Sequence, residues 1–245
     1  MSIPLWVIVA LILWLLWCWV AHWIMKNPRS DISTGLVWRG FQIYARLCHH
    51  IHIQGQHHIP QGTEVGPLIV ISNHTAGVDP ILIQSACPFF IRWMMALDMR
   101  LEQLESFWTW LDIISVDRHG REVIATRQAI RHLAQGGVLG IFPEGTLERP
   151  PEHILPFLPG VGLIARKSNA RVLLVIISGT PQSDPAWSSL WKPSYATIRF
   201  LEPVSYAGTQ LKPAQIAEDL RRRLAGASGW PLLDEPDPAA IHNGK

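Results

Sequence analysis

The chain has 245 residues, a length that suits one domain, or one domain plus an anchor, with a sizeable buried core. Its formal net charge of +2 is too small to indicate a surface for nucleic acid. The three cysteines, Cys18, Cys48 and Cys87, are scattered, which excludes a disulfide framework and metal-ligand spacing and favours a reducing compartment.

The first predicted element is an apolar helix at residues 3–25. This segment contains no Asp, Glu, Lys or Arg. At about 1.5 Å per residue it gives about 35 Å of helix, enough to cross a hydrocarbon core of roughly 30 Å. Lys26 and Arg29 follow it, so the positive-inside rule places the rest of the chain in the cytoplasm. We expect residues 1–27 to be a transmembrane or membrane-embedded helix; a buried core helix is the alternative.

A second helix is predicted over residues 28–49, starting near Ser30 or Asp31 after Pro28. Arg39, Gln42 and Arg46 recur on one stripe of this helix, and apolar residues cover the rest. Such a pattern is typical of an amphipathic helix that lies in the membrane interface with its arginines among anionic headgroups. A core helix packed on the domain is the open alternative.

From residue 50 to 228, strands alternate with helices, which predicts an α/β domain with a mostly parallel sheet flanked by helices. Strands are expected at 50–53, 68–72, 138–142, 172–178 and 197–201, and helices near 80–86, 99–110, 121–135, 160–169 and 213–225. Residues 229–245 are rich in charge and proline and lack periodicity, so we expect a disordered tail.

The stretch NHTAGVDP, residues 73–80, follows the apolar run LIVIS and places His74 five positions before Asp79. Neither a strand nor a continuous helix brings two such side chains together. Gly77 permits the chain to reverse, and Asp79 before a proline is typical of an N-cap. A strand, a tight loop and a helix are therefore predicted, with both side chains at the carboxyl end of the strand, where α/β sheets bind ligands.

An imidazole titrates near neutral pH, and a neighbouring carboxylate orients the ring and stabilises the imidazolium. His74 and Asp79 therefore form a candidate general base with its orienting group. The alternative is a capping aspartate beside an ordinary loop histidine; loss of a cap would cost about 1 kcal/mol. G-x-S-x-G does not occur, and Cys87 shows no local sign of activation, so direct transfer to a substrate's hydroxyl, amine or water is favoured over a covalent intermediate.

Three other stretches are candidates for binding. In IFPEGT, residues 141–146, Gly145 would let an anion approach the backbone, although an ordinary turn is the alternative. In SVDRHG, residues 115–120, Arg118 could bind a phosphate or carboxylate. The histidine-rich HHIHIQGQHHIP, residues 49–60, could bind a metal through His50 and His52, but solvated edge-strand histidines are the better interpretation because no carboxylate or set spacing accompanies them.

Taken together, these stretches resemble the glycerolipid acyltransferase family, in particular the bacterial 1-acyl-glycerol-3-phosphate (lysophosphatidic acid) acyltransferases. NHTAGVDP is similar to the family's His-x4-Asp block, SVDR to its second block and FPEGT to its third. ARVLLVIISGT, residues 170–180, is similar to the apolar fourth block, and the similarity in pattern runs over roughly residues 51–204.

The resemblance implies transfer of a fatty acyl chain from acyl-CoA or acyl carrier protein to the free hydroxyl of a lysophospholipid, above all 1-acyl-sn-glycerol-3-phosphate, to give phosphatidic acid. His74 would be the base and Asp79 would hold its ring. Arg118 and the turn of Glu144, Gly145 and Thr146 would bind the acceptor's headgroup. The resemblance implies a thioester co-substrate but no metal or other cofactor, and a bacterial-type inner membrane with the catalytic domain on its cytoplasmic face.

Three positions depart from the family pattern. Leu147 stands where FPEGT is usually followed by arginine, Leu158 where a lysine is common, and Leu174 where a proline is usual. Two cations that would contact phosphate are thus replaced by leucine. The open alternatives are another lyso-lipid or amino-lipid acceptor and a non-catalytic lipid-binding relative, and from the histidine-rich strand a metal-dependent hydrolase.

Overall fold

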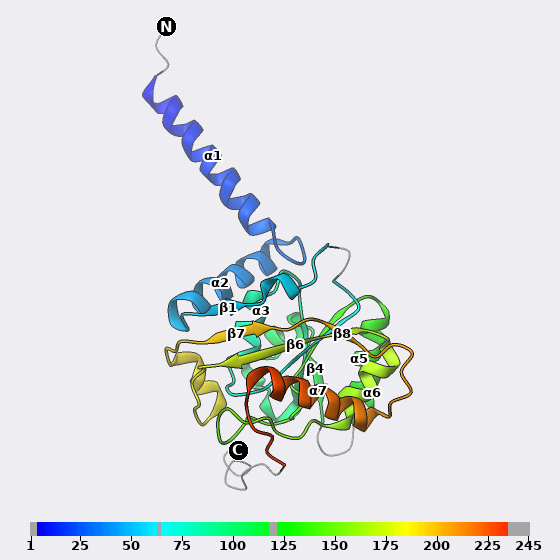
Figure 1. The fold of residues 1–245 in the computed structure, drawn as a ribbon. Coiled ribbons are helices and arrows are strands. Elements are labelled where there is room, and N and C mark those ends of the chain that lie inside the picture. Colours follow the sequence, from blue (N-terminus) through cyan, green and yellow to red (C-terminus); the bar gives the residue numbers. More distant parts are fainter. Residues whose placement is uncertain (1–3, 63–64, 118–121, 235–245) are drawn as a thin grey trace.

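The computed structural model describes residues 4–62, 65–117 and 122–234. Figure 1 shows a layered α/β domain from which one helix, α1 (Leu5–Met25), extends away. Within the described residues, eight strands form one sheet in the order β1-β7-β6-β2-β5-β3-β4, with β8 paired to β6. The strands are β1 His52–Gln54, β2 Leu68–Ser72, β3 Arg92–Ala96, β4 Ile114–Val116, β5 Val138–Ile141, β6 Arg171–Ser178, β7 Thr197–Phe200 and β8 Val204–Ser205.

β2 lies at the centre of the sheet, parallel to β5 on one side and to β6 on the other. All five of its residues are buried, as expected for a strand covered on both faces. β7 and β8 run antiparallel to β6, while β1 runs parallel to β7 and β4 parallel to β3. The predicted α/β fold with a mostly parallel sheet is confirmed.

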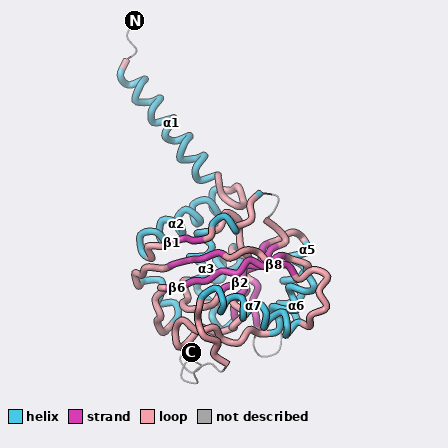
Figure 2. Tube along the Cα trace, in the orientation of Figure 1, coloured by secondary structure: helices cyan, strands magenta, loops and turns pink. Residues whose placement is uncertain are grey.

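Helices cover both faces of the sheet (Figure 2). One face packs on α5 (Glu122–Ala134), α6 (Pro159–Ser168) and α7 (Pro213–Ser228), and the other on α2 (Ile32–Cys48) and α3 (Asp79–Ala86). Side chains of β2 alternate between the two cores: Ile69 and Ile71 join the first, Leu68 and Val70 the second. The apolar run of β2 therefore anchors both layers, which fixes the position of its carboxyl end.

Several elements differ from the sequence prediction. β3, β4 and β8 were not expected; β3 has one buried and four half-buried residues and so shows no alternation, and β4 and β8 have only three and two residues. The helix expected at 99–110 is only α4 (Glu105–Trp110), preceded by 3₁₀ turns at Leu97–Met99 and Glu102–Leu104. The strand expected from residue 50 begins at His52, because His50 has a left-handed backbone with φ of 39°.

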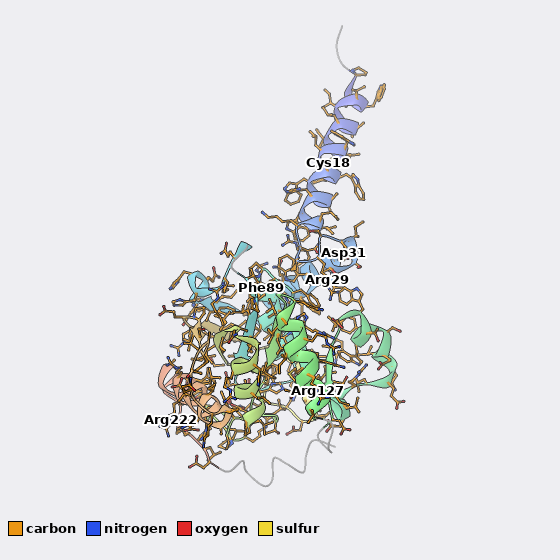
Figure 3. The ribbon with its side chains drawn as sticks, turned by 90° about the vertical axis from the view of Figure 1, so that its right-hand side faces the viewer. Cys18, Arg29, Asp31, Phe89, Arg127 and Arg222 are labelled. Atoms are coloured by element: carbon orange, nitrogen blue, oxygen red, sulfur yellow. The ribbon has the colours of Figure 1, made fainter. Side chains whose placement is uncertain are left out.

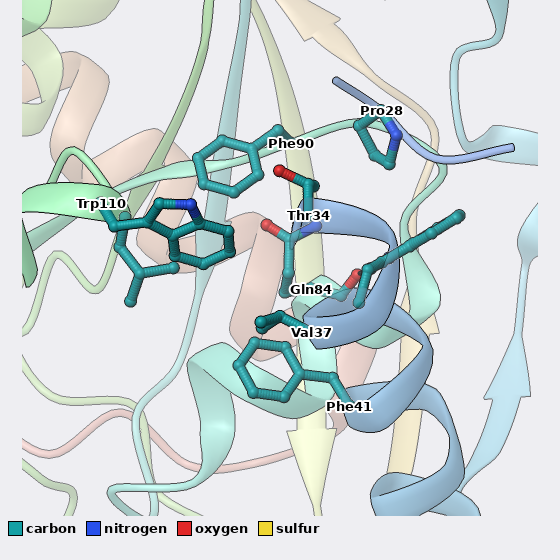
Figure 4. Close-up of a pocket in the computed structure, with 9 residues that line it drawn as sticks. Pro28, Thr34, Val37, Phe41, Gln84, Phe90 and Trp110 are labelled. Carbon is teal, nitrogen blue, oxygen red and sulfur yellow. Dashed lines mark hydrogen bonds between the residues drawn. The ribbon is translucent and has the colours of Figure 1, made fainter. Parts of the chain in front are cut away.

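α1 and α2 meet at a junction that is bonded to the domain. The Arg29 guanidinium lies 3.7 Å from the centroid of the Phe90 ring and donates to the Trp110 carbonyl at 3.1 Å. Figure 3 shows Arg29 and Asp31 at this junction, between α1 and the domain. Beside it lies a small pocket between α2, α3 and α4 (Figure 4), lined by Pro28, Thr34, Val37, Trp38, Phe41, Gln84, Phe90, Trp110 and Leu111.

α2 combines the two arrangements considered for it. One face packs on α3 and buries Thr34 and Ala45. Gly35 is buried against the end of α1, where a Cβ would clash with the Ile24 carbonyl oxygen. The opposite face exposes an apolar stripe of Ile32, Leu36, Ile43 and Leu47. Arg39 does not lie on an open surface as expected: it donates to the carbonyls of Trp23 and Lys26 at the end of α1, at 2.8 and 3.1 Å. A cation at the C-terminal end of a helix satisfies carbonyls that have no partner within the helix.

The start of the expected disordered tail is hydrogen-bonded to the domain. Ile154 donates its N–H to Pro231 and accepts from Leu233, at 3.0 and 3.1 Å. The Arg221 guanidinium, 5% exposed, donates to the Leu233 carbonyl and to the Asp234 carboxylate. A buried arginine needs acceptors, and residues up to 234 supply them. The remainder of the expected tail, 235–245, lies outside the described residues.

Candidate active site

The turn that links β2 to α3 carries the predicted His74 and Asp79. β2 ends at Ser72 and α3 begins at Asp79, so the predicted order of strand, loop and helix is confirmed. The structure brings the two side chains together: His74 Nδ1 lies 2.9 Å from Asp79 Oδ2. The pair sits at the carboxyl end of the central strand, where the ends of β5 and β6 also lie.

Asp79 does not cap α3, contrary to the sequence interpretation. Its carboxylate turns back into the loop, where Oδ2 accepts from the backbone N–H groups of Thr75 at 2.7 Å and Ala76 at 2.8 Å. The side chain is fully buried. Asp79 therefore holds the turn in shape and at the same time presents its oxygen to the imidazole of His74, because one buried acceptor satisfies all three donors.

The hydrogen bond to Asp79 selects the tautomer of His74. Since a carboxylate only accepts, Nδ1 carries the proton, and Nε2 is left with the lone pair that can accept one from a substrate. The ring stacks on Phe142 with centroids 4.0 Å apart, and Phe142 stacks in turn on Trp93 at 5.0 Å. The side chain of His74 is 21% exposed, so the base is both fixed in orientation and open to a ligand.

Glu144, Gly145 and Thr146 lie in the turn after β5, beside His74. Glu144 points inward: it is 6% exposed, and its pKa is raised well above the ordinary value by burial, then by the nearby charge of Glu148. Gly145, at φ of 69°, and Thr146 are half-buried. A Cβ at Gly145 would lie 2.9 Å from the Leu158 side chain, so this apolar residue covers the turn where the family pattern has lysine.

Arg118 lies outside the described residues. The strand that leads to it, β4, ends at Val116. β4 stands at one edge of the sheet, separated from β2 by β3 and β5. Its carboxyl end lies at the same edge of the sheet as the His74 turn, because β4, β3, β5 and β2 are parallel.

Two residues that sequence reasoning missed hold the backbone of His74. The Asn73 side chain, fully buried, accepts from the N–H of Ile177 and donates to its carbonyl, both at 2.9 Å, and donates to Glu148 Oε2 at 3.2 Å. The N–H of Glu148 in turn donates to the His74 carbonyl at 2.6 Å. The place of Asn73, between a buried strand and a candidate base, was a usable signal; nothing in the sequence singled out Glu148.

Further contacts join the same turn to the third and fourth sequence blocks. The hydroxyls of Thr75 and Thr180 are hydrogen-bonded to each other. Arg149 donates from Nη1 to the Thr75 carbonyl at 3.0 Å. Segments about 75 and 105 residues from the histidine in sequence therefore fix its loop from both sides.

Burial of Glu148 makes the stability of the domain depend on pH. The pKa of this carboxyl is raised to about 7, chiefly because burial disfavours its charged form. The unfolded chain releases the proton near pH 4.5, so between about pH 4.5 and 7 the native state holds more protons and the free energy of unfolding falls as pH rises, by roughly 3 kcal/mol in all. Glu148→Gln carries no charge and should lose much less between pH 5 and pH 8.

Chemical denaturation of the wild type and Glu148→Gln at the two pH values measures this difference. The matched control is Glu202→Gln, which replaces an exposed glutamate and should follow the wild type. An equal loss of stability in wild type and Glu148→Gln would mean that the Glu148 carboxyl is not the group that titrates.

The remaining candidates do not gather at a second site. Cys87 is 1% exposed, and burial raises the pKa of its thiol, which disfavours the nucleophilic thiolate. His49, buried, bridges the Tyr44 hydroxyl at 2.8 Å and the Ser194 hydroxyl at 2.7 Å, a structural role. Among the residues described here, no three His, Cys, Asp or Glu side chains converge as metal ligands would.

Known acyltransferases are similar to this chain in sequence and in fold. The model of the acyltransferase family matches residues 50–178. A 1-acyl-sn-glycerol-3-phosphate acyltransferase of Borreliella burgdorferi is 30% identical over 134 residues, which are 53% of this chain and 52% of the relative. The match thus spans about half the length of that curated relative. The crystal structure of the 1-acyl-sn-glycerophosphate acyltransferase PlsC from Thermotoga maritima has the same fold, with a TM-score of 0.62, 22% identity and coverage of 80% of this chain and 83% of that one.

The matched segment begins just before β1 and ends with β6, so it contains the His74 turn, the turn after β5 and the central strands that position them. The resemblance first inferred from four short blocks is confirmed by a model that covers more than half of the sequence. The chain belongs to the acyltransferase family.

Proposed function

We propose that this protein is a membrane-anchored enzyme that transfers a fatty acyl chain from acyl-CoA or acyl carrier protein to the free hydroxyl of a lysophospholipid, with 1-acyl-sn-glycerol-3-phosphate as acceptor and phosphatidic acid as product. The observation that carries this proposal is the 2.9 Å contact between His74 Nδ1 and the buried Asp79 carboxylate. It leaves Nε2 of an oriented imidazole as a base at the carboxyl end of the sheet.

The reaction needs from the protein only this base and hydrogen-bond donors that stabilise the negative charge of the intermediate and of the substrate's headgroup. Nε2 of His74 takes the proton of the acceptor hydroxyl while that oxygen attacks the thioester carbonyl carbon. The tetrahedral intermediate then collapses, the C–S bond breaks, and the thiolate leaves and takes the proton back from the imidazolium. Asp79 stabilises the imidazolium in between, and general-base catalysis of this kind contributes about 10²- to 10⁴-fold in rate.

The acceptor's headgroup would lie along the turn after β5. Gly145 and Thr146 are half-buried there and close to the stacked pair of His74 and Phe142. Arg118 would add the cation, since a guanidinium binds phosphate with two parallel hydrogen bonds. Glu144 would act from beneath the turn rather than touch the ligand, because its side chain is 6% exposed.

α1 would anchor the enzyme where acceptor and product reside. Its 21 residues include no buried one, and their length and composition suit a membrane span. The basic residues Lys26 and Arg29 at its end favour a catalytic domain on the cytoplasmic face. The bilayer would thus be both the support of the enzyme and the source of its acceptor.

The test is acyl transfer from a labelled acyl-CoA or acyl carrier protein in membranes that contain the protein, compared with membranes that lack it. Lysophosphatidic acid should be acylated, and monoacylglycerol, which has the same hydroxyl but no phosphate, should not. The specific reason to include other lyso-lipids and amino-lipids is Leu158, which covers Gly145 with an apolar side chain. Transfer to one of these but not to lysophosphatidic acid would mean that the protein is an acyltransferase with a different acceptor. No transfer to any acceptor would contradict the proposal.

A further inference from the structure

The loop between β6 and β7 exposes two large aromatic side chains. Trp191, at the end of the 3₁₀ helix η5 (Ala186–Trp191), is 86% exposed, and Tyr195 is 80% exposed. Lys192 and Pro193 between them are also exposed. Large aromatic rings with a polar edge are costly to leave in water and are enriched where proteins meet the headgroups of a bilayer. Two of them on one short loop therefore indicate a contact surface.

This loop is held firmly against the end of α2. The Ser194 N–H donates to the Cys48 carbonyl at 3.0 Å, and the Tyr44 hydroxyl donates to the Leu190 carbonyl at 2.6 Å. His50 stacks on Tyr195 with ring centroids 4.8 Å apart. Figure 1 shows the yellow loop between β6 and β7 beside the C-terminal end of α2. The aromatic pair is thus displayed on a fixed support.

The exposed aromatics continue the exposed stripe of α2. Along this stripe Ile32 is 63%, Leu36 55%, Ile43 49% and Leu47 70% exposed. The spacing of four, seven and four residues places these side chains on one face of the helix. The stripe starts next to the end of α1 and finishes at Leu47, one residue before the Cys48 carbonyl that binds the loop. The stripe therefore runs along α2 from the end of α1 to the helix end at which the loop of Trp191 and Tyr195 is bonded.

We propose that Trp191 and Tyr195, together with Leu47, form a second membrane contact that inserts into the headgroup region of an anionic bilayer. This inference rests on the proposed anchoring of α1. The occupant follows from position, because the stripe on α2 begins where α1 would leave the membrane. It also follows from charge, because Lys192 next to Trp191 and Arg46 next to Leu47 are exposed cations that suit anionic headgroups.

The second contact has a mechanical reason. A domain held by α1 alone would meet the bilayer at one end only, whereas α2 spans about 25 Å at 1.5 Å per residue and places the aromatic pair at its far end. Contacts at both ends of α2 fix the domain on the surface. The same loop also touches the active-site turn: Ser189 Oγ accepts from the Val78 N–H at 3.1 Å, and a Cβ at Gly77 would lie 2.6 Å from the Ala186 carbonyl. The loop that carries the aromatic pair therefore also packs on the turn that carries His74.

Fluorescent labels at single cysteines test this inference in the full-length protein reconstituted in vesicles of phosphatidylglycerol and phosphatidylethanolamine. The loop label uses Lys192→Cys with Cys18→Ser and Cys48→Ser, because Cys87, 1% exposed, does not react. The anchor label uses native Cys18 in α1 with Cys48→Ser. The control label uses Arg222→Cys on α7 with Cys18→Ser and Cys48→Ser; the Arg222 side chain is 71% exposed at the end of the domain opposite α1 (Figure 3).

The loop label is expected to shift to the blue on vesicle binding and to lose about half its intensity to a lipid with a nitroxide on its headgroup, while the control label does neither. The anchor label should be quenched by a nitroxide deep in the acyl chain. A loop label that behaves like the control overturns the inference. If the anchor label is still quenched in that case, only the second contact is wrong; if it is not quenched, the proposed anchoring by α1 is wrong as well. A blue shift without vesicles that grows with protein concentration would assign the surface to a second copy of the chain and also overturn it.

Activity gives a second readout. Trp191→Ser with Tyr195→Ser should slow transfer to acceptor embedded in vesicles by roughly tenfold and leave transfer to a water-soluble short-chain acceptor unchanged. The matched control is Val123→Ser with Ile124→Ser on α5, which removes residues 60% and 53% exposed away from this surface. Equal losses with both acceptors would mean that the aromatic pair only supports the Val78 turn, and no loss with either would mean that it makes no contact.

Discussion

His74→Ala is expected to abolish acyl transfer, with a fall in kcat of about 10²- to 10⁴-fold, while the domain stays folded. Within the part of the chain that the structure describes, His74 is the one group hydrogen-bonded to Asp79 that has a nitrogen free to act as a base, and the variant removes it. A water molecule in its place would lack the proton affinity of an imidazole and the support of the Phe142 ring, which stacks on His74 with centroids 4.0 Å apart.

The fold should survive this substitution because the turn keeps its own hydrogen bonds. Asp79 still accepts from the N–H groups of Thr75 and Ala76, and the Glu148 N–H still donates to the carbonyl of residue 74. The measurement is transfer of labelled acyl groups in membranes, paired with thermal unfolding of the purified protein. His52→Ala, which replaces an exposed histidine of β1, is the matched control and should keep full activity. Full activity in His74→Ala would remove the general base from the mechanism.

The parts of the fold that could be predicted are those where local pattern and burial agree. LIVIS indicated a strand buried on both faces, Gly77 a reversal, and the proline after Asp79 a helix start, and the structure has β2, the turn and α3 in that order. The helix expected at 121–135 is α5, although the face that it buries is that of Ala125, Ala129 and Leu133, and Val123, expected on the apolar face, is exposed. Local patterns therefore placed the candidate base and its partner correctly.

What could not be predicted depends on partners far away in the sequence. β4 has three residues and β3 mixes buried with half-buried side chains, so neither shows a period of its own; each is a strand because a neighbour supplies its hydrogen bonds. Asn73 is fixed by Ile177 and Glu148, 104 and 75 residues further along the chain. A single sequence contains no sign of such pairings, which arise only when the sheet closes.

Asp79 shows the same limit at the scale of one side chain. Its place before a proline suggested a cap, and a cap was the simplest local role for it. The tertiary turn instead directs the carboxylate backward, to donors that precede it in the chain. The predicted contact with His74 is present, whereas the predicted cap is replaced by hydrogen bonds that shape the turn.

Two substitutions of Asp79 separate its charge from its hydrogen bonds. Asp79→Asn keeps an oxygen that can accept from the N–H groups of Thr75 and Ala76, so the variant should fold like the wild type. It lacks the negative charge that stabilises the His74 imidazolium. A hydrogen bond to a charged group is worth about 1.5 to 3 kcal/mol, which alone corresponds to roughly 10- to 100-fold in rate. We therefore expect Asp79→Asn to be nearly inactive but stable.

Asp79→Ala should lose both activity and stability. It leaves two buried N–H groups without an acceptor, at about 1 to 3 kcal/mol each, so the expected loss of unfolding free energy is roughly 2 to 6 kcal/mol rather than the 1 kcal/mol or so of a missing cap. Denaturant unfolding and acyl transfer are measured on both variants, with Asp98→Asn at an exposed aspartate as control. An active Asp79→Asn would mean that the carboxylate only shapes the turn, and a fully stable Asp79→Ala would mean that the two N–H groups have found water, so that the turn does not depend on this carboxylate for its shape.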